Sequence, residues 1–409
     1  MRSVDNFFPY IATTFHYIGE KVDFREVSFW KVVFIIICLV ILIFYADNPA
    51  SKIAISVAFL LVFGDLASLL YFNTFYLEFS VVAGCFLSLS AVALLIAIPD
   101  KPKKYLVVFS IFSLAWLAFS KQQYLPLASF LSLALAVIFL YRWRARKTSL
   151  IFLLFSLFFP IAFGLLNKDD KGHMKSINLA NKTNTFLWAV LPEARDKEAA
   201  LSNLGLPSSC LSGIGKSWYS PGVQQNHPCP EVEKLSRIRL IRLFIVDPST
   251  FIQPMYKAIL GTHPLYPDYL GHLENPAAVN SSKYIFYKVT SLTTWVARLP
   301  PQVYFLASLI PMISGVAFIF VLIGTGNSKK YNNEFNRLIL AFIVLGGLAS
   351  LYAIGSSVFG DGYADLHKHT VAFTIGVAFQ VSGAALAVVS YGLSHYTPLR
   401  KTSMPPAGR

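Results

Sequence analysis

Residues 338–371 read LILAFIVLGGLASLYAIGSSVFGDGYADLHKHTV, in which a long apolar run ends in a short segment rich in charge. The apolar part, residues 338–358, is as long as a helix that crosses a bilayer, which needs about 20 residues. The whole chain shares this character, because 55% of its 409 residues are hydrophobic, 14% are charged and the mean hydropathy is +0.56. This composition indicates a polytopic membrane protein.

Further apolar runs of similar length predict an all-α bundle of about nine transmembrane helices. Together with 338–358 they are residues 29–46, 53–70, 79–98, 105–120, 125–141, 150–166, 303–323 and 371–391. The second run is the least regular, because Asp65 lies inside it. The run 105–120 is short for a full crossing and would need a thinned bilayer or a re-entrant path.

Basic residues form four groups beside these runs, as the positive-inside rule expects of cytoplasmic loops. The groups are Lys101, Lys103 and Lys104; Arg142, Arg144, Arg146 and Lys147; Lys329, Lys330 and Arg337; and Arg400 with Lys401. This topology explains the formal net charge of +14 without nucleic acid as a partner.

The same topology divides the chain into five parts. They are an external juxtamembrane segment at 1–28, a transmembrane bundle of about six spans at 29–166, an extracytoplasmic loop domain at 167–301, a second bundle of three spans at 302–391 and a cytoplasmic tail at 392–409.

The loop domain is predicted to be rich in α-helix. Pro192 and the following EARDKEAALSNLG indicate a helix that ends at Gly205, and Pro230 indicates the start of a second. In the second helix basic residues alternate with apolar ones, the basic residues being Lys234, Arg237, Arg239 and Arg242. That pattern suits either an anionic membrane surface or packing onto the rest of the loop with the arginines solvated.

The four cysteines occupy two kinds of position. Cys38 and Cys85 lie within apolar runs and are interpreted as small buried residues. Cys210 and Cys229 bracket a polar stretch rich in glycine and proline, which predicts a disulfide if that side is oxidising. Such a bridge would stabilise the domain by roughly 3 kcal/mol. A zinc site that adds His227 is the less favoured alternative, because paired metal-ligand spacings are missing.

Polar residues gather at the predicted outer ends of several spans. In FGDLASLLYFNTFYLEFS, residues 63–80, a continuous helix would put Asp65, Asn73 and Tyr76 on one face and leave Glu78 at the end of the turn. An acid in the middle of a membrane helix costs roughly 2.5 to 3.5 kcal/mol, so it usually faces a cavity and a partner. We therefore favour a functional role for Asp65 over simple pairing with a polar neighbour.

Two further segments add charge at the same membrane edge. Lys121 lies between two spans, where a lysine either snorkels to the interface or holds a lipid-linked phosphate. After the run 338–358, a helix would align four polar residues in one stripe, namely Asp361, Asp365, Lys368 and His369. His367 would point elsewhere. The stripe predicts one wall of a cleft, and a local salt bridge from Asp365 is the structural alternative.

These segments together resemble a known family. The stretches FGDLASLLYFNTFYLE, SKQQYLPLA, NLGLP, DYLG and GDGYADLHKH look like the multi-spanning hexosyltransferases of bacterial surface-glycan biosynthesis, the S-layer glycan type, which are similar in architecture to GT-C glycosyltransferases. The resemblance runs from about Phe24 to Tyr391. It implies a multi-pass protein of the bacterial cytoplasmic membrane that moves a hexose from a polyprenyl-phosphate donor to a glycan or lipid-linked acceptor on the extracytoplasmic side.

The resemblance also implies roles for the polar residues. Lys121, Lys368 and His369 would hold the donor phosphate, and Asp65 and Glu78 would be the catalytic acids. The remaining residues of the outward cavity would orient the acceptor, and these are Asn73, Tyr76, Asp361 and Asp365. Membrane lipids would surround the site, the large loop would close over the acceptor, and a divalent cation is neither required nor excluded.

The start of the chain departs from that family. GT-C enzymes carry a catalytic acid in a first external loop that follows an additional N-terminal span, and this chain begins within the corresponding loop. Asp5 is too isolated from a recognisable motif to inherit that role. The expectation is therefore a truncated reading or an inactive relative.

Two other functions fit a polytopic protein with an external loop. A lipid-linked glycan flippase or transporter usually shows internal repeats and a site near the bilayer midplane, whereas here the polar residues gather at one face. An O-antigen-type polymerase or ligase typically concentrates arginines in its large loop. Turnover of a labelled donor, compared with its movement across liposomes, separates an enzyme from a carrier.

Overall fold

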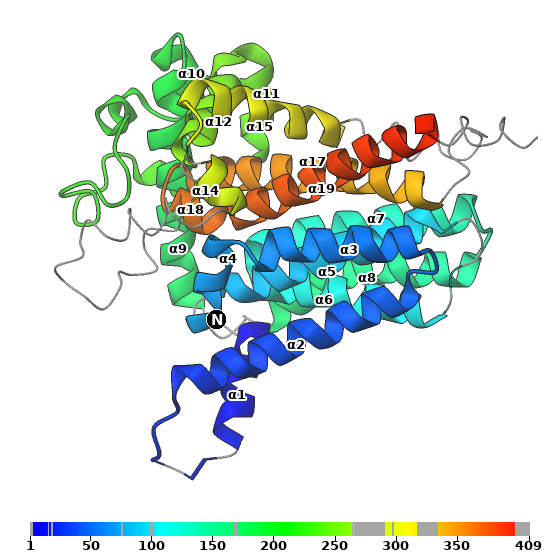
Figure 1. The fold of residues 1–409 in the computed structure, drawn as a ribbon. Helices are drawn as coiled ribbons and strands as arrows, with labels where there is room; N and C mark the ends of the chain where they lie inside the picture. The colour runs from blue at the N-terminus through cyan, green and yellow to red at the C-terminus, as the bar shows by residue number, and fades with distance from the viewer. Residues whose placement is uncertain are drawn as a thin grey trace, which may run out of the picture.

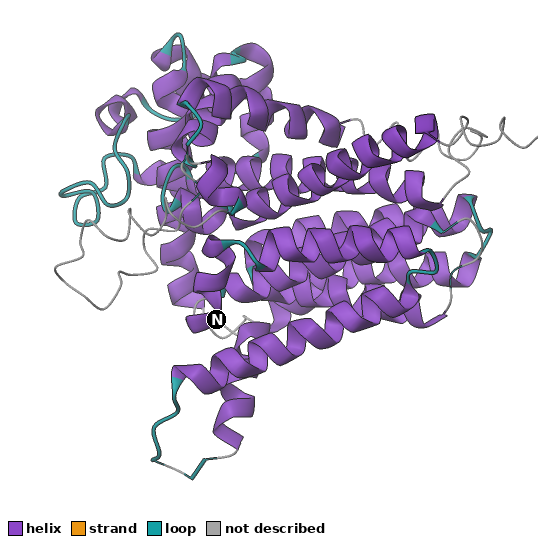
Figure 2. Cartoon of the chain, viewed as in Figure 1, coloured by secondary structure: helices purple, strands orange, loops and turns teal. Residues whose placement is uncertain are grey.

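The helices of the chain follow the apolar runs of its sequence. The computed structural model describes residues 3–14, 16–17, 19–74, 77–98, 102, 104–166, 171–263, 265, 291–296, 298–316 and 334–396. These residues form helices, turns and loops, and no β-strand occurs among them (Figure 2).

Each of the nine apolar runs contains most or all of one described helix. These helices are α2 (Phe24–Tyr45), α3 (Pro49–Phe63), α5 (Glu78–Ala97), α6 (Lys104–Ser120), α7 (Leu125–Tyr141), α8 (Arg146–Leu166), α15 (Pro301–Val316), α17 (Glu334–Asp361) and α19 (Val371–Tyr396). By length and composition α2, α5, α7 with the turn before it, α17 and α19 can cross a membrane, whereas α3, α6 and the described part of α15 are shorter apolar helices. The chain is therefore a polytopic helical membrane protein, and the number of spans beyond these five stays a prediction.

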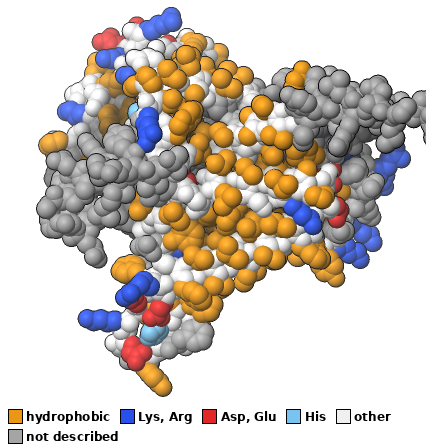
Figure 3. All heavy atoms as spheres, viewed as in Figure 1, with side chains coloured by type: hydrophobic (Ala, Val, Ile, Leu, Met, Phe, Trp, Pro, Cys, Tyr) orange, Lys and Arg blue, Asp and Glu red, His pale blue; other side chains and the backbone are white. Residues whose placement is uncertain are grey.

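The centre of the bundle is α5. Every residue of this helix is buried, which is the arrangement expected of a helix that is apolar on all sides. Helices α3, α6, α17 and α19 pack around it. The axes of most bundle helices lie roughly along one line across Figure 1. The outer helices instead expose apolar side chains such as Ile37 and Leu157, as a lipid-facing surface requires. Figure 3 shows these side chains over the middle of the molecule, with most of the charged ones nearer its ends.

Two glycines let α17 and α19 approach closely. A Cβ atom on Gly346 would lie 2.5 Å from the carbonyl oxygen of Gly376, and a Cβ on Gly376 would lie 2.4 Å from that of Gly346. No side chain fits there, so the backbones themselves are in contact. Small residues at such crossings are the usual way in which membrane helices pack.

The second apolar run is not one helix. Helix α3 ends at Phe63, the chain turns at Gly64, and Asp65 caps the short helix α4 (Leu66–Leu70) by accepting the N–H of Ala67 at 2.9 Å. A 3-10 turn, Tyr71–Asn73, follows. The prediction that Asp65 lies in the middle of a helix and shares a face with Asn73 is therefore wrong, because an aspartate next to a glycine favours a new helix start.

The first residues pack into the bundle. A 3-10 turn, Val4–Asn6, leads into α1 (Phe7–Thr14), and Phe8 is fully buried. Its ring centroid lies 5.3 Å from that of Phe79 on α5 and 5.8 Å from that of Trp116 on α6. These ring contacts hold the N-terminal segment against the ends of α5 and α6.

The segment between α8 and α15 forms a second, helical unit. It contains α9 (Lys171–Thr183), a π-helix Asn184–Val190, a 3-10 turn Leu191–Glu193, α10 (Lys197–Leu204), 3-10 turns Ser208–Gly213 and Pro230–Lys234, α11 (Ile238–Val246), α12 (Ser249–Gly261) and α14 (Leu292–Val296). The unit has its own apolar core, around Phe186, Leu201 and Leu240. A disulfide joins Cys210 to Cys229, as their spacing indicated.

The two helices predicted in this unit begin at other residues than the sequence indicated. Helix α10 begins at Lys197 with Asp196 as its cap rather than at Pro192, although it ends at Gly205 as expected, with φ +74°. The second predicted helix is split, because the turn at Pro230 is separate from α11. One face of α11 packs on the unit, and Arg239, although exposed, donates to the carbonyl of Leu204 at 2.6 Å.

The helical unit lies at one end of the bundle (Figure 1). Helices α5, α7 and α19 begin at this end, and α6 and α17 finish there. At the opposite end Arg142 donates to the carbonyls of Ile96 and Ile98 at 2.6 and 2.7 Å, where its charge complements the C-terminus of α5. The loop unit and this basic group thus lie at opposite ends, as the predicted topology requires, while the membrane side of each stays a prediction.

Candidate functional site

A large cavity lies where the loop unit meets the bundle. Its volume is about 1190 Å³, whereas most small-molecule sites measure about 300 to 1,000 Å³. The lining comes from the start of α7, the end of α17, α9 and the disulfide-closed loop. Polar side chains supply much of it, among them Lys121, Gln122, Gln123, Asn178, Asn181, Trp218, Tyr219, Arg237, Ser356, Asp361, Asp365 and His369.

Asp361 is the centre of a hydrogen-bond network in this cavity. Its Oδ2 lies 3.2 Å from Nε2 of His369, and its Oδ1 accepts from Nδ2 of Asn184 at 3.0 Å. Asn181, with its amide oriented to donate, lies 3.0 Å from the same Oδ1. The positive charge of Arg237 is also within reach. These partners bring three separated segments together around one carboxylate.

The turn after α17 creates this arrangement. The predicted single helical stripe is wrong, because α17 ends at Asp361 and a new short helix, α18 (Leu366–His369), begins after Asp365. Gly362 has φ +63°, and a Cβ there would lie 2.4 Å from the carbonyl oxygen of Asn184. Only glycine permits that approach. Asp361 and His369 therefore meet across a turn and not along a helix face.

Both ring nitrogens of His369 lie beside side-chain oxygens. Its Nδ1 lies 3.0 Å from Oε1 of Gln123. The amide nitrogen of Gln123, Nε2, donates to the hydroxyl of Ser356 and to the carbonyl of His369. Asp361 favours the protonated ring, but burial and the charge of Lys121 oppose it and leave the pKa of His369 below its ordinary value. The net charge of this ring is therefore small near neutral pH, which makes it a weaker phosphate ligand than the sequence indicated.

Lys121 connects the cavity to a buried acid. Its Nζ lies 3.4 Å from Oε1 of Glu78, which is 1% exposed at the start of α5. Burial lowers the pKa of Lys121, and the charge of Glu78 opposes that shift. Glu78 Oε2 has no hydrogen-bond partner among the described residues. Glu78 thus holds the lysine at the cavity wall but does not itself line the cavity.

Asp5, which stands apart from any motif in the sequence, continues this charged group into the protein. It is 2% exposed and accepts the hydroxyl of Ser80 at 2.6 Å. Lys31, also buried, donates to the carbonyls of Tyr71 and Thr74 and attracts both Asp5 and Glu78. Burial raises the pKa of Asp5 to about 6 against the attraction of Lys31. The contact joins residues 75 positions apart, which no local pattern predicts.

Asp65 lies outside the cavity lining. Besides capping α4, it accepts the N–H of Thr293 at 2.8 Å on Oδ2 and the hydroxyl of Thr293 at 2.8 Å on Oδ1. Both oxygens are therefore used to tie α4 to α14, which is a structural arrangement. Tyr76 and the side chain of Asn73 lie outside the described residues.

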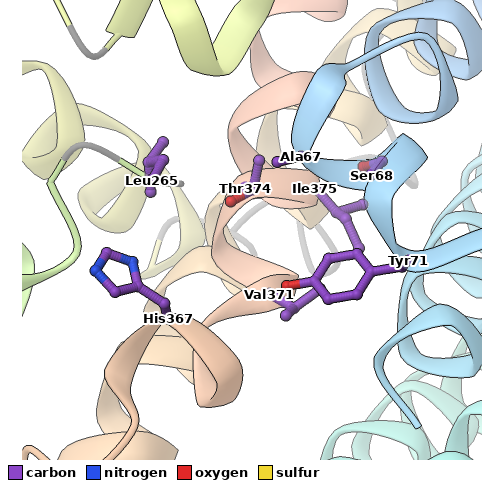
Figure 4. A pocket seen from close by; sticks show the side chains of 8 residues that line it. All are labelled: Ala67, Ser68, Tyr71, Leu265, His367, Val371, Thr374 and Ile375. Atoms are coloured by element: carbon purple, nitrogen blue, oxygen red, sulfur yellow. The ribbon is translucent and has the colours of Figure 1, made fainter. Parts of the chain in front are cut away.

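Of the remaining predicted residues, Asp365 and His367 line two different pockets, and Lys368 is in the lining of neither. Asp365 is exposed at the cavity wall with φ +45°, and the charge of Lys368 is close enough to disfavour protonation of Lys121. His367 instead lines a separate pocket of about 20 Å³ between α18, α19 and α4 (Figure 4). Its separation from Asp361, Asp365 and His369 agrees with the prediction that it points elsewhere.

The cysteines leave little scope for the zinc alternative. Cys210, Cys229 and Glu231 have ligand atoms within 4.8 Å of one another, but the disulfide uses both sulfurs. His227 is engaged as well, because its Nδ1 accepts the N–H of Cys229 at 3.1 Å and its Nε2 lies 2.8 Å from the hydroxyl of Thr183.

Comparison with known protein families gives a match over most of the chain. The family model described as the YfdI N-terminal transmembrane domain matches residues 15–402. No curated protein and no solved structure matches the chain. Since that family model covers nearly all of the helical bundle and the loop unit described above, the chain belongs to the YfdI N-terminal transmembrane domain family.

Proposed function

We propose that this protein is a membrane glycosyltransferase, which moves a hexose from a polyprenyl-phosphate-linked donor to a cell-surface glycan or lipid-linked acceptor. The observation that carries the proposal is the large cavity at one end of the bundle, which combines cations with carboxylates. The YfdI family is linked to glucosylation of O-antigen, which supports the same class of reaction.

Two cations suit the donor phosphate. Arg237 lines the cavity, and its guanidinium group donates to the carbonyl of Gly360 at 3.0 Å while its Nε has no partner among the described residues. A guanidinium keeps its charge when half-buried and offers several donors in a fixed geometry, which matches phosphate. Lys121 adds a second positive charge at the membrane edge of the same cavity.

The two carboxylates of the cavity, Asp361 and Asp365, have different roles. Asp361 is engaged by His369, Asn184 and Asn181 and thus orders the site. Asp365 lines the cavity and is exposed, so we assign it the role of general base. The acceptor oxygen attacks the anomeric carbon while the bond from that carbon to the phosphate oxygen breaks. The bonding electrons leave with the phosphate, and the acceptor proton goes to Asp365.

The test uses purified protein in liposomes with a labelled polyprenyl-phosphate hexose and an acceptor glycan. We expect label on the acceptor, and a loss of about 100-fold or more when Asp365 is replaced by Asn, since general bases typically contribute 10²–10⁴-fold. Glu198→Gln, an exposed acid on α10 outside the cavity lining, is the control. Label that crosses the bilayer without reaching the acceptor would instead indicate a flippase.

A further inference from the structure

The loop closed by the disulfide carries two aromatic residues into the cavity wall. Cys210 and Cys229 are fully buried and separated by 19 positions, so the bridge closes the base of the loop. Trp218 and Tyr219 both line the cavity, and Tyr219 is 66% exposed. An exposed aromatic ring beside a polar cavity is a common element of ligand sites, because it offers a flat apolar face.

Three contacts fix this loop to the helices beneath it. Gly215 donates its N–H to the carbonyl of Leu187 at 2.7 Å, and Trp218 donates its N–H to Oδ1 of Asn184 at 2.7 Å. Because Nδ1 of His227 accepts an N–H, its proton belongs on Nε2, which donates to the hydroxyl of Thr183 at 2.8 Å. Together with the disulfide, these bonds hold the loop in place before any ligand arrives.

Asn184 connects the loop to the carboxylate cluster. This residue is fully buried at the start of the π-helix, and it accepts from Trp218 while donating to Asp361. The side-chain amide of Asn184 therefore positions both the backbone of Trp218 and the carboxylate of Asp361. π-Helical turns are rare and are often found at functional sites. The two hydrogen bonds of Asn184 therefore fix the position of the Trp218 backbone relative to Asp361.

We propose that the Cys210–Cys229 loop is the hexose subsite of this cavity, with the ring of Trp218 as the platform for the sugar and Tyr219 at its rim. The apolar C–H face of a pyranose packs on an indole ring, and the sugar hydroxyls are then within the same cavity as Asp361 and Asp365. The inference rests on the proposed function, because it assigns the sugar end of the donor whose phosphate Arg237 and Lys121 would hold.

Binding in detergent separates the two ends of the donor. The probes are farnesyl phosphate and three farnesyl phosphoryl hexoses, carrying glucose, galactose or mannose, with Kd measured by titration calorimetry. We expect at least one sugar-bearing probe to bind more tightly than farnesyl phosphate. Trp218→Ala should weaken that probe about tenfold and leave farnesyl phosphate unchanged. Trp295→Ala, a 56% exposed tryptophan on α14 outside the cavity lining, should alter neither.

The outcomes distinguish the inference from the proposed function. If farnesyl phosphate binds but no sugar increases its affinity, or if Trp218→Ala affects every probe equally, the sugar subsite is wrong while the phosphate site stands. If the native protein binds none of the probes, both are wrong. The double variant Cys210→Ser with Cys229→Ser, shown to be folded by its circular dichroism, should repeat the selective loss seen for Trp218→Ala.

Discussion

At the residue scale, the site depends on carboxylates that occupy very different surroundings. Asp361 accepts hydrogen bonds from several donors, and Asp365 is exposed at the cavity wall. Both carboxylate oxygens of Asp65 accept hydrogen bonds, from the start of α4 and from Thr293. The sequence identified the first two because charge beside a membrane span is unusual. It could not separate them from Asp65, since the use of each oxygen depends on contacts with distant segments.

Asp5 makes the clearest prediction about pH. Its pKa in the folded protein is about 6 and its ordinary value is 3.8, so between these values the folded state binds more protons than the unfolded state. Stability contributed by Asp5 is therefore present below about pH 4 and is lost as the pH rises to about 6. Asp5→Asn keeps an acceptor for the hydroxyl of Ser80 and removes this loss.

The measurement is the unfolding free energy of both proteins in detergent across this pH range. Near neutral pH we expect Asp5→Asn to be more stable than the native protein by up to about 3 kcal/mol, which is the shift of roughly two pKa units expressed as energy. The advantage should disappear toward about pH 4. An advantage that is the same at both ends of the range would show that the charge of Asp5 is not the cause.

At the element scale, the lengths of the apolar runs located the helices of the bundle but not their ends. The nine apolar runs correspond to nine helices, because a long apolar segment in a membrane has few alternatives to helix. Breaks inside such runs depend on turn geometry. The break after α3 is a local one, where Asp65 caps a new helix, whereas the turn at Gly362 depends on its close approach to Asn184. These two breaks changed the predicted faces of Asp65 and of the segment after α17.

Asp65 tests this reading of the break between α3 and α4. Asp65→Ala removes the cap and both bonds to Thr293, and leaving such buried donors without an acceptor costs about 1–3 kcal/mol each. We expect a clear fall in melting temperature, with unchanged hexose transfer per folded molecule. Asp65→Asn keeps one acceptor oxygen, so its melting temperature should fall less. A loss of transfer at unchanged melting temperature would return Asp65 to the catalytic residues.

At the scale of the whole molecule, the positive-inside rule and the structure lead to one arrangement. The basic residues around Arg142 lie at one end of the bundle, and the loop unit with its cavity lies at the other. The sequence predicted an outward cavity but not its full lining, because α9 and the disulfide-closed loop join α7 and α17 in forming it. Convergence of segments so far apart is a property of the tertiary structure.

Labelling of single cysteines checks the orientation. Ser202→Cys lies on α10, where Ser202 is exposed, and it should react with a membrane-impermeant reagent in intact cells. Ser328→Cys, in the segment before Lys329 and Lys330, should react only after the membrane is opened. The reverse pattern would invert the topology and move the cavity to the cytoplasmic side.

The most direct test of the proposed donor site compares two arginines of the same segment. Arg237 lines the cavity, whereas Arg242 is exposed on α11 and lies outside the cavity lining. The measurement is transfer of labelled hexose from the polyprenyl-phosphate donor by Arg237→Gln and by Arg242→Gln, each corrected for the folded fraction. We predict a loss of tenfold or more for Arg237→Gln and native transfer for Arg242→Gln. Equal transfer by the two variants would contradict a phosphate site in this cavity.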